Sequence, residues 1–261
     1  MKCVQLPKRF YQKCPFCNSE QIMMMRGLVR DMEDFEVHIS HDRGYSFCNC
    51  RNIFYTDYKN INKAIYDESY GKWYETSKDI KTIAVNEIEK LYPKLKSLCP
   101  DAKSFFEIGS IHDYVLDYMK EKGLEVSSLN ICKRESKHPF EVADFEEYAP
   151  TKKYDIVFAS HIFEHFKDPK KELLKCKEML TDKGILYIAM PDTFFADFEG
   201  GRAQQFDWVV NEHYILWNMD NWIEFCEEQG LKCIYKERGL DLHKQKSDKW
   251  FWKQDFKIIC K

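Results

Sequence analysis

Tyr154–Asp192, with the sequence YDIVFASHIFEHFKDPKKELLKCKEMLTDKGILYIAMPD, is the stretch that decides the fold of this chain. Its first apolar run, residues 156–158, predicts a short strand that is buried on both faces, as in a parallel sheet. A helix should follow, because Asp168 can cap free backbone N–H groups and Pro169 suits the first helical position. The stretch therefore begins as a strand that leads into a helix.

The second half of the stretch predicts another strand. Residues 181–184 should end the helix, and the apolar run 185–190 then stops at Pro191, which cannot donate to a sheet ladder. Two parallel strands joined by a helix bind ligands at the carboxyl ends of the strands. Those ends hold Ser160, His161, Pro191 and Asp192.

Length and charge exclude several classes of protein. The chain has 261 residues and a net charge of −3, from 40 basic and 43 acidic residues. It therefore lacks the excess of positive charge that would favour nucleic acid or an anionic membrane as a partner. No apolar run approaches the roughly 20 residues of a membrane span, and residues 1–7 lack the apolar stretch of a signal peptide. We expect a cytoplasmic protein with no membrane span.

Four of the eleven cysteines are spaced as metal ligands. A CxxC pair and, about thirty residues later, a CxC pair can supply the tetrahedral thiolate set that Zn²⁺ prefers, with room for a hairpin between them. These residues are Cys14, Cys17, Cys48 and Cys50. The zinc would be structural, and His38 or His41 could replace one ligand. The alternative is that all four are free thiols.

The remaining segments complete an alternating pattern. Residues 60–76 form an aromatic connector that either staples the small segment to the larger one, which we favour, or lines a pocket. Helical spacing over 78–98 predicts a helix interrupted by Pro93. The other expected strands are 103–109, 124–131, 140–143, 231–238 and 250–260, with helices at 114–122 and 220–229, a crossover at 132–139 too short for a helix, and an insertion at 194–218.

This order predicts an α/β fold: a doubly wound, Rossmann-like sheet that ends in an antiparallel hairpin, plus a small N-terminal zinc ribbon. We expect three parts. They are the ribbon at 1–60, the aromatic connector and helix at 61–100, and the sheet domain at 101–261.

The motifs of the central stretch resemble a known family. From about residue 104 to 260 the chain resembles a class I S-adenosylmethionine-dependent methyltransferase, whose small-molecule branch has the pattern DxVxxxxVLEHxxDPxxxLxxxxxxLxxGGxLxxxxP. Residues 163–165 (FEH) and 168–169 (DP) match it closely. The cysteine ribbon, the YDESY segment at 66–70 and the His213-Tyr214 pair are similar to features of sugar and polysaccharide methyltransferases.

The resemblance implies a cofactor site for S-adenosylmethionine. Its residues would be Glu107, Gly109, Ser110, Asn130, Asp144, Phe145, Ala159, Ser160 and His161. Three positions depart from the family pattern: Ile111 and Asp113 replace glycines, and Asn130 replaces the acidic residue that binds the ribose. Asparagine can still pair with a hydroxyl group, and Asp113 could meet the ammonium group of the cofactor.

The resemblance also implies O-methylation of a sugar, a glycan or another small hydroxyl-bearing acceptor. His213 and Asp192 are the candidate bases, and His165 is expected to support the site from the start of the helix. Two alternatives stay open: a binding protein that has lost the cofactor, and a nucleic-acid methyltransferase that grips its substrate with the ribbon.

Overall fold

The computed structural model describes residues 22–30, 37–48, 53–55, 78–193, 213–244 and 250–261. Contacts between Cα atoms divide the chain into two compact units. The first comprises Met1–Ile61, Met190–Trp222 and Arg238–Phe256, and the second comprises Asn62–Ala189, Ile223–Glu237 and Lys257–Lys261. No helix in the described ranges is both long and apolar enough to cross a membrane.

The first unit contains a four-stranded sheet in the order β1-β2-β3-β9. Its strands are β1 (Ile22–Arg30), β2 (Val37–Cys48), β3 (Ile53–Tyr55) and β9 (Ile215–Leu216). Strands β1 and β2 form the antiparallel hairpin expected between the cysteine pairs, and Ile22 is paired with Cys48. Cys48 therefore lies at the end of the hairpin where the chain enters β1. Cys14, Cys17 and Cys50, like the aromatic connector, lie outside the described residues.

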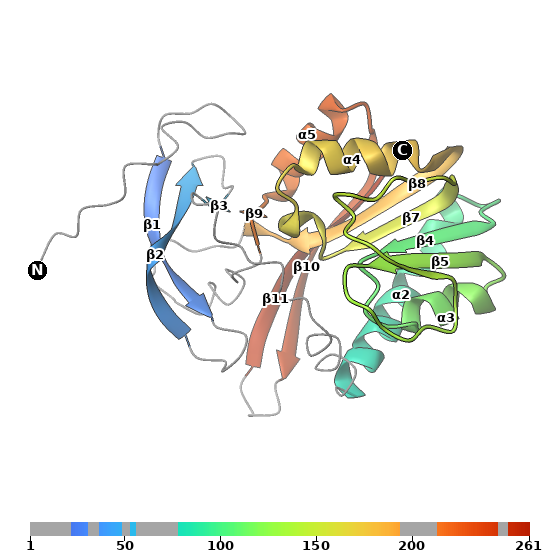
Figure 1. Cartoon of the computed structure of the whole chain (residues 1–261), viewed down its shortest axis with the longest axis horizontal. Helices are drawn as coiled ribbons and strands as arrows, with labels where there is room; N and C mark the ends of the chain where they lie inside the picture. The colour runs from blue at the N-terminus through green and yellow to red at the C-terminus, as the bar shows by residue number, and fades with distance from the viewer. Residues whose placement is uncertain (1–21, 31–36, 49–52, 56–77, 194–212, 245–249) are drawn as a thin grey trace, which may run out of the picture. The chain divides into compact units, whose positions relative to one another are not determined.

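A seven-stranded sheet has the strand order β10-β11-β8-β7-β4-β5-β6, and most of its residues belong to the second, larger unit (Figure 1). Its strands are β4 (Ser104–Ile108), β5 (Glu125–Asn130), β6 (Phe140–Val142), β7 (Tyr154–Ser160), β8 (Leu180–Pro191), β10 (Cys233–Lys244) and β11 (Trp250–Cys260). The pairs β4–β5, β4–β7, β5–β6 and β7–β8 are parallel. Lys232 and Lys261 exchange backbone hydrogen bonds, the antiparallel pattern of the terminal hairpin. The predicted Rossmann-like sheet and hairpin are confirmed.

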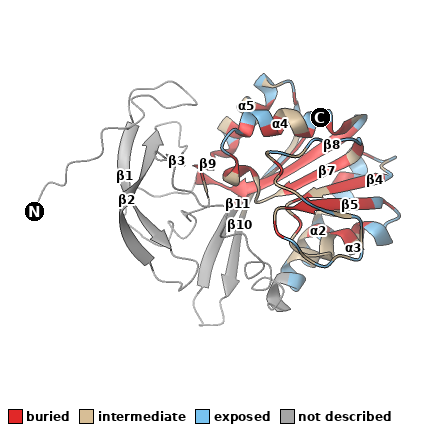
Figure 2. Ribbon diagram, in the orientation of Figure 1, coloured by how far each residue is buried: buried red, intermediate tan, exposed pale blue. Residues whose placement is uncertain are grey.

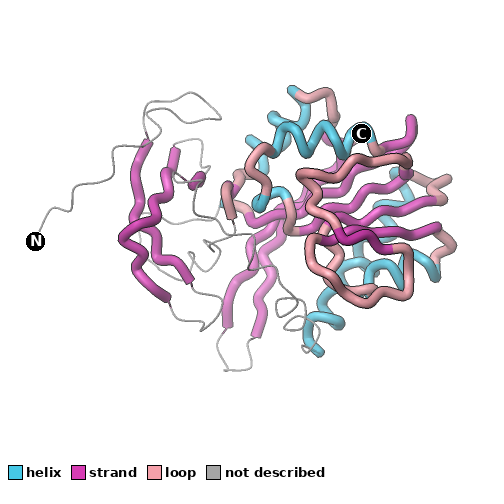
Figure 3. The backbone as a smooth tube through the Cα atoms, in the orientation of Figure 1, coloured by secondary structure: helices cyan, strands magenta, loops and turns pink. Residues whose placement is uncertain are grey.

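Helices cover both faces of this sheet, as the backbone tube shows (Figure 3). They are α2 (Lys78–Leu98), α3 (Tyr114–Glu121), α4 (Pro169–Glu178) and α5 (Met219–Glu228). Ile88 and Leu95 of α2 and Leu116 of α3 pack on one set of alternating strand residues, including Phe105 and Ile156. Strands β4 and β7 and the second half of β8 are buried almost throughout (Figure 2), which explains why their sequences are apolar runs rather than alternating patterns.

Asp155, the second residue of the stretch 154–192, links the amino ends of three strands through hydrogen bonds. One carboxylate oxygen accepts hydrogen bonds from the backbone of Lys103 and Ser104, and the other accepts one from Thr181. Burial alone would raise the pKa of this carboxyl group, but these hydrogen bonds outweigh burial and lower it. The carboxylate thus joins β4, β7 and β8.

The structure corrects two expectations. Residues 181–184 do not end the helix: α4 already ends at Glu178, and these residues belong to the first part of β8, whose pairing with β7 has a register irregularity between Tyr154 and Ile156. Pro93 does not interrupt the helix at 78–98 either, because α2 runs through it. Pro93 is exposed, so any distortion at this position faces solvent rather than the core.

Candidate cofactor and active site

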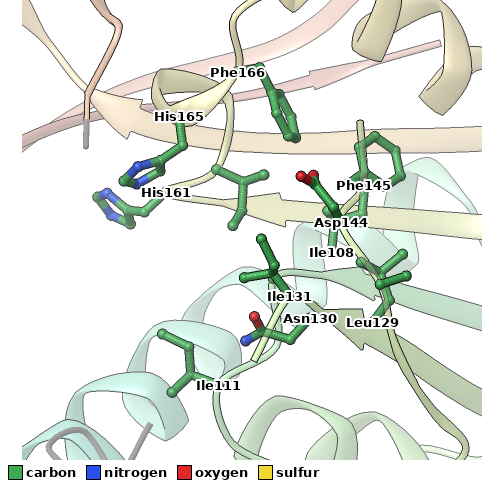
Figure 4. A pocket seen from close by; sticks show the side chains of 13 residues that line it. Ile108, Ile111, Leu129, Asn130, Ile131, Asp144, Phe145, His161, His165 and Phe166 are labelled. Atoms are coloured by element: carbon green, nitrogen blue, oxygen red, sulfur yellow. The ribbon is translucent and has the colours of Figure 1, made fainter. Parts of the chain in front are cut away.

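A cavity opens at the carboxyl ends of the parallel strands of the second unit (Figure 4). Its empty volume, including space open to solvent, is about 670 Å³. The residues that line it follow β4, β5, β6 and β7: Ile108, Gly109, Ile111, Leu129, Asn130, Ile131, Ala143, Asp144, Phe145, His161, Ile162, His165 and Phe166. Parallel α/β sheets bind ligands at this edge, so this cavity is the candidate site.

Gly109 makes the turn at the end of β4. Its φ of 76° lies in the left-handed region that glycine adopts without strain. A Cβ atom on this residue would lie 2.0 Å from Cδ1 of Ile162, so the side chain of Ile162 covers the glycine. The position therefore needs glycine both for its backbone angle and for the close approach of Ile162.

Asn130 ends β5 and holds the loop that follows β4. Its side-chain nitrogen donates to the carbonyl of Ser110 at 3.0 Å, and its side-chain oxygen accepts from the backbone N–H of Cys132 at 3.1 Å. Each group has one further hydrogen-bonding position. Asn130 can thus stabilise the loop and still present its amide to a ligand in the cavity.

Arg134, which the sequence did not single out, fixes the same loop. Its guanidinium donates to the carbonyl and the hydroxyl of Ser110 and to Asp113, with 2.6 Å between Nη1 and Oδ1 of Asp113. Only 5% of the Arg134 side chain and 11% of the Asp113 side chain are exposed. Asp113 also accepts from Ser136 and from the backbone of Lys137. The carboxylate expected to meet a cofactor ammonium is instead paired within the chain.

These contacts also set the protonation of Asp113. Burial alone would raise the pKa of its carboxyl group, but the hydrogen bonds from Lys137, Arg134 and Ser136 outweigh burial and hold the pKa below its usual value. Asp113 is therefore ionised at neutral pH, and the pair with Arg134 persists.

Asp144 and Phe145 follow β6 on the opposite side of the cavity. The carboxylate of Asp144 faces the cavity (Figure 4) and accepts a hydrogen bond from the backbone of Glu146. The ring of Phe145 is buried against Phe166, with 5.6 Å between the ring centroids, and Nζ of Lys175 lies over it at 4.7 Å. An acceptor group beside an aromatic ring can hold a flat heterocycle that carries an amino group.

Glu107 lies on β4, one residue from the cavity lining. Its Oε2 is buried and has no hydrogen-bond partner. Burial raises the pKa of this carboxyl group to about 7, although a hydrogen bond from Ser110 and the charge of Arg134 partly oppose the rise. The residue predicted to bind the cofactor is thus a carboxyl group that titrates near neutrality.

Two histidines lie together at the end of the cavity away from Phe145 (Figure 4). Nδ1 of His161 is 3.4 Å from Oε1 of Glu164, which is only 1% exposed. A ring nitrogen of His165 lies within 4.8 Å of a Glu164 carboxylate oxygen. A buried carboxylate thus lies close to two imidazole rings, and its negative charge favours a proton on the neighbouring ring nitrogen.

The other predicted residues are not among those that line the cavity. Ala159 is fully buried in β7, and Ser160 ends that strand, so neither lines the cavity. The Asp192 carboxylate is buried and ion-paired with Arg238 at 2.7 Å. His213 is half-buried in the first unit.

Sequence reasoning missed several residues of the site. Apolar residues such as Ile131, Ile162 and Phe166 line the cavity. A sequence does not mark them, because the same apolar residue types also fill the hydrophobic core. Glu164 was visible within the FEH motif, and its burial next to two histidines is what the sequence could not show.

Comparison with known proteins identifies the family. A family described as "Methyltransferase domain" matches residues 80–243. The chain belongs to this methyltransferase family. A search of curated proteins found no match to this chain. The matched range contains the whole cavity lining, from Ile108 to Phe166.

Solved structures share the fold of the methyltransferase. A 1,6-didemethyltoxoflavin-N1-methyltransferase from Burkholderia thailandensis is similar with a TM-score of 0.57 and 10% identity, over 85% of this chain and 96% of that one. A SAM-dependent methyltransferase from Archaeoglobus fulgidus gives 0.52 and 16%, over 76% and 99%. The N-methyltransferase NodS from Bradyrhizobium japonicum gives 0.50 and 12%, over 74% and 96%.

Proposed function

We propose that this methyltransferase binds S-adenosylmethionine in the cavity and transfers the methyl group to a hydroxyl group of a sugar, a glycan or another small acceptor. The observation that carries the proposal is the cavity itself, where a left-handed glycine after β4 faces a carboxylate and an aromatic ring after β6. The Burkholderia relative of the same fold was solved with S-adenosylhomocysteine bound, which supports this cofactor.

Residues of the cavity fit the parts of such a cofactor. The Asp144 carboxylate would accept a hydrogen bond from the adenine amino group, and Phe145 would pack against the base. The remaining hydrogen-bonding positions of Asn130 would serve the ribose hydroxyl groups. When bound, the cofactor supplies an electrophilic methyl group on a positively charged sulfur. Gly109 allows close approach of the backbone because it has no side chain.

One observation favours the alternative of a binding protein without the cofactor. The side chain of Ile162 covers Gly109, where the amino-acid end of the cofactor is expected to lie. Ile162 must turn away before that end can bind. Part of the binding free energy then goes into this movement, which lowers the affinity.

Calorimetric titration with S-adenosylhomocysteine tests the proposal. We expect saturable heat from the wild-type protein and its loss in Asp144→Ala. The matched control is Asp101→Ala, which removes an exposed carboxylate from the turn before β4, at the opposite end of that strand. No heat at millimolar ligand would overturn the proposal and favour the alternative. Equal binding by both variants would place the cofactor elsewhere.

The acceptor class is the finer part of the proposal. The resemblance to sugar methyltransferases supports a hydroxyl group, whereas the relatives named above include N-methyltransferases. Mass spectrometry of protein incubated with methyl-labelled cofactor and either methyl glucoside or a simple primary amine separates the two. Label on the amine alone would exclude the hydroxyl acceptor.

We also propose a structural zinc ion bound by Cys14, Cys17, Cys48 and Cys50. The chemistry of four thiolates supports it, as does the hairpin β1–β2, which brings Cys48 next to the start of β1. Four cysteine ligands leave no open position on the metal, so the ion would stabilise the fold and take no part in methyl transfer.

A further inference from the structure

We propose that His161, oriented by Glu164, is the base that takes the proton from the acceptor. The inference rests on the proposed function, because it assumes that a methyl group is transferred in this cavity. It differs from the expectation drawn from sequence, which assigned the proton to His213 or Asp192 and assigned His161 to the cofactor site.

The backbone of His161 is held in an unusual conformation. Its φ of 54° makes it the one non-glycine residue with a positive φ among the described residues. The backbone N–H donates to the carbonyl of Ala189 in β8 at 2.8 Å, which anchors the residue at the edge of the sheet. A left-handed conformation costs an L-residue about 1–2 kcal/mol, and such strain concentrates at functional sites. The conformation lets a residue at the end of β7 contribute to the cavity lining.

Glu164 stands behind the imidazole. Its carboxylate is only 1% exposed and lies 3.4 Å from Nδ1 of His161, three residues earlier. A carboxylate at this position favours the proton on Nδ1 and leaves Nε2, on the other side of the ring, as the proton acceptor. The His161 side chain is 34% exposed, so an acceptor molecule can reach it.

The charged groups around His161 suit the transfer of one proton from the acceptor to its imidazole ring. Among the residues that line the cavity, the titratable side chains besides that of His161 are His165 and Asp144, and the Glu164 carboxylate lies close to both histidines. Asp144 belongs to the other end of the cavity (Figure 4). The Glu164 carboxylate, 3.4 Å from Nδ1 of His161, would stabilise the imidazolium that forms.

The step balances in atoms and charge. The acceptor oxygen forms a bond with the methyl carbon while the carbon–sulfur bond breaks, and the electron pair of that bond stays on sulfur. The proton of the hydroxyl group moves to Nε2 of His161. The positive charge that leaves the sulfur thus appears on the imidazole, where Glu164 compensates it.

Proton titration of the histidines tests the pair without any acceptor. Nitrogen-15 spectra of the whole protein, with the His161 signal assigned by its loss in His161→Gln, should show the His161 pKa lowered by roughly one unit or more in Glu164→Gln. The matched control is Asp117→Asn, which removes the carboxylate 2.7 Å from His138, away from the cavity. It should leave the His161 titration unchanged. An unchanged His161 pKa in Glu164→Gln would overturn the proposal.

Ligand and turnover measurements separate this inference from the proposed function. S-adenosylhomocysteine should shift the His161 signals but not those of His138. His161→Gln should bind S-adenosylhomocysteine with wild-type heat, yet lose roughly 10²–10⁴-fold in methyl transfer to methyl glucoside, together with the acid limb of the pH profile. His138→Gln should keep wild-type turnover.

Absence of binding heat in the wild type would refute the proposed function, whereas binding with undiminished turnover in His161→Gln would refute the role of His161 alone.

Discussion

Gly109 is constrained by its own backbone and by a neighbouring side chain. A methyl group at this position meets a φ of 76° and a contact of 2.0 Å with Ile162. We expect Gly109→Ala to lower the free energy of unfolding by about 1–2 kcal/mol through the backbone angle, and by a similar amount through the clash. Urea unfolding of the variant measures the sum.

A double-mutant cycle separates the two contributions at Gly109. Ile162→Ala removes the clash and leaves the backbone angle, so the double variant should be more stable than the sum of the single effects by about 1 kcal/mol or more. Strictly additive effects would mean that Ile162 moves away at little cost. In that case its contact with Gly109 would not hinder a ligand.

Glu107 predicts an unusual dependence of stability on pH. Its carboxyl group has a pKa of about 7 in the folded chain, raised from 4.5 chiefly by burial. Between these values the folded state binds more protons than the unfolded state, so stability should fall as the pH rises from 4.5 to 7. Above that range the ionised group lowers the free energy of unfolding by about 3 kcal/mol.

The variant Glu107→Gln tests this prediction. It should be more stable than the wild type near pH 8, and the difference should shrink as the pH approaches 5, because the wild-type group is then protonated. Urea unfolding at both pH values provides the measurement. A difference that does not change with pH would show that the group ionises in the folded chain without penalty.

Arg134 connects two elements, the loop after β4 and the crossover between β5 and β6. Its replacement by methionine leaves the Asp113 carboxylate largely buried without its cation, which should cost about 3 kcal/mol of stability. Arg134→Met/Asp113→Asn should recover part of that loss, since the unpaired charge is gone. Lysine should not restore it, because one ammonium group cannot reach Ser110 and Asp113 together.

A control for this prediction is Lys152→Met, which removes an exposed ion pair with Glu125. It should change stability little, because solvent screens such pairs. Equal losses in Lys152→Met and Arg134→Met would mean that the buried network does not hold the loop.

At the same scale, the sequence predicted elements better than contacts between them. Asp168 caps α4 by accepting from the backbone of Lys171, as its position before Pro169 indicated. The apolar runs of β7 and β8 were recognisable because both faces are covered. Pro93 within α2 and residues 181–184 within β8 were not, since neighbouring elements hold the backbone against its local preference.

The candidate site was predictable only in part, for a related reason. The resemblance to the methyltransferase family implied Gly109, Asn130, Asp144 and Phe145 as cofactor residues, and all four line the cavity. The pairing of Asp113 with Arg134 depends on a contact between residues 21 positions apart, and no local pattern marks it. The burial of Glu164 behind His161 likewise appears only in three dimensions.

For the whole molecule, the proposed zinc ion makes a direct prediction. Purified protein should contain about one zinc per chain, and a strong chelator should lower its melting temperature, because the metal would hold a segment too small to fold alone. Cys14→Ser should abolish the metal content. Cys132→Ser, which alters a buried thiol after β5, should retain it. Atomic absorption measures both, and a metal-free wild type would exclude the zinc site.

The place of β11 in the sheet has a consequence for biosynthesis. This strand comes after all other described elements in the chain, yet it lies between β10 and β8, with Phe256, Ile258 and Ile259 fully buried. While the chain is still emerging from the ribosome, the edge of β8 therefore remains uncovered. A message truncated before residue 250 would yield a protein with that apolar edge exposed, which we expect to aggregate or to be degraded.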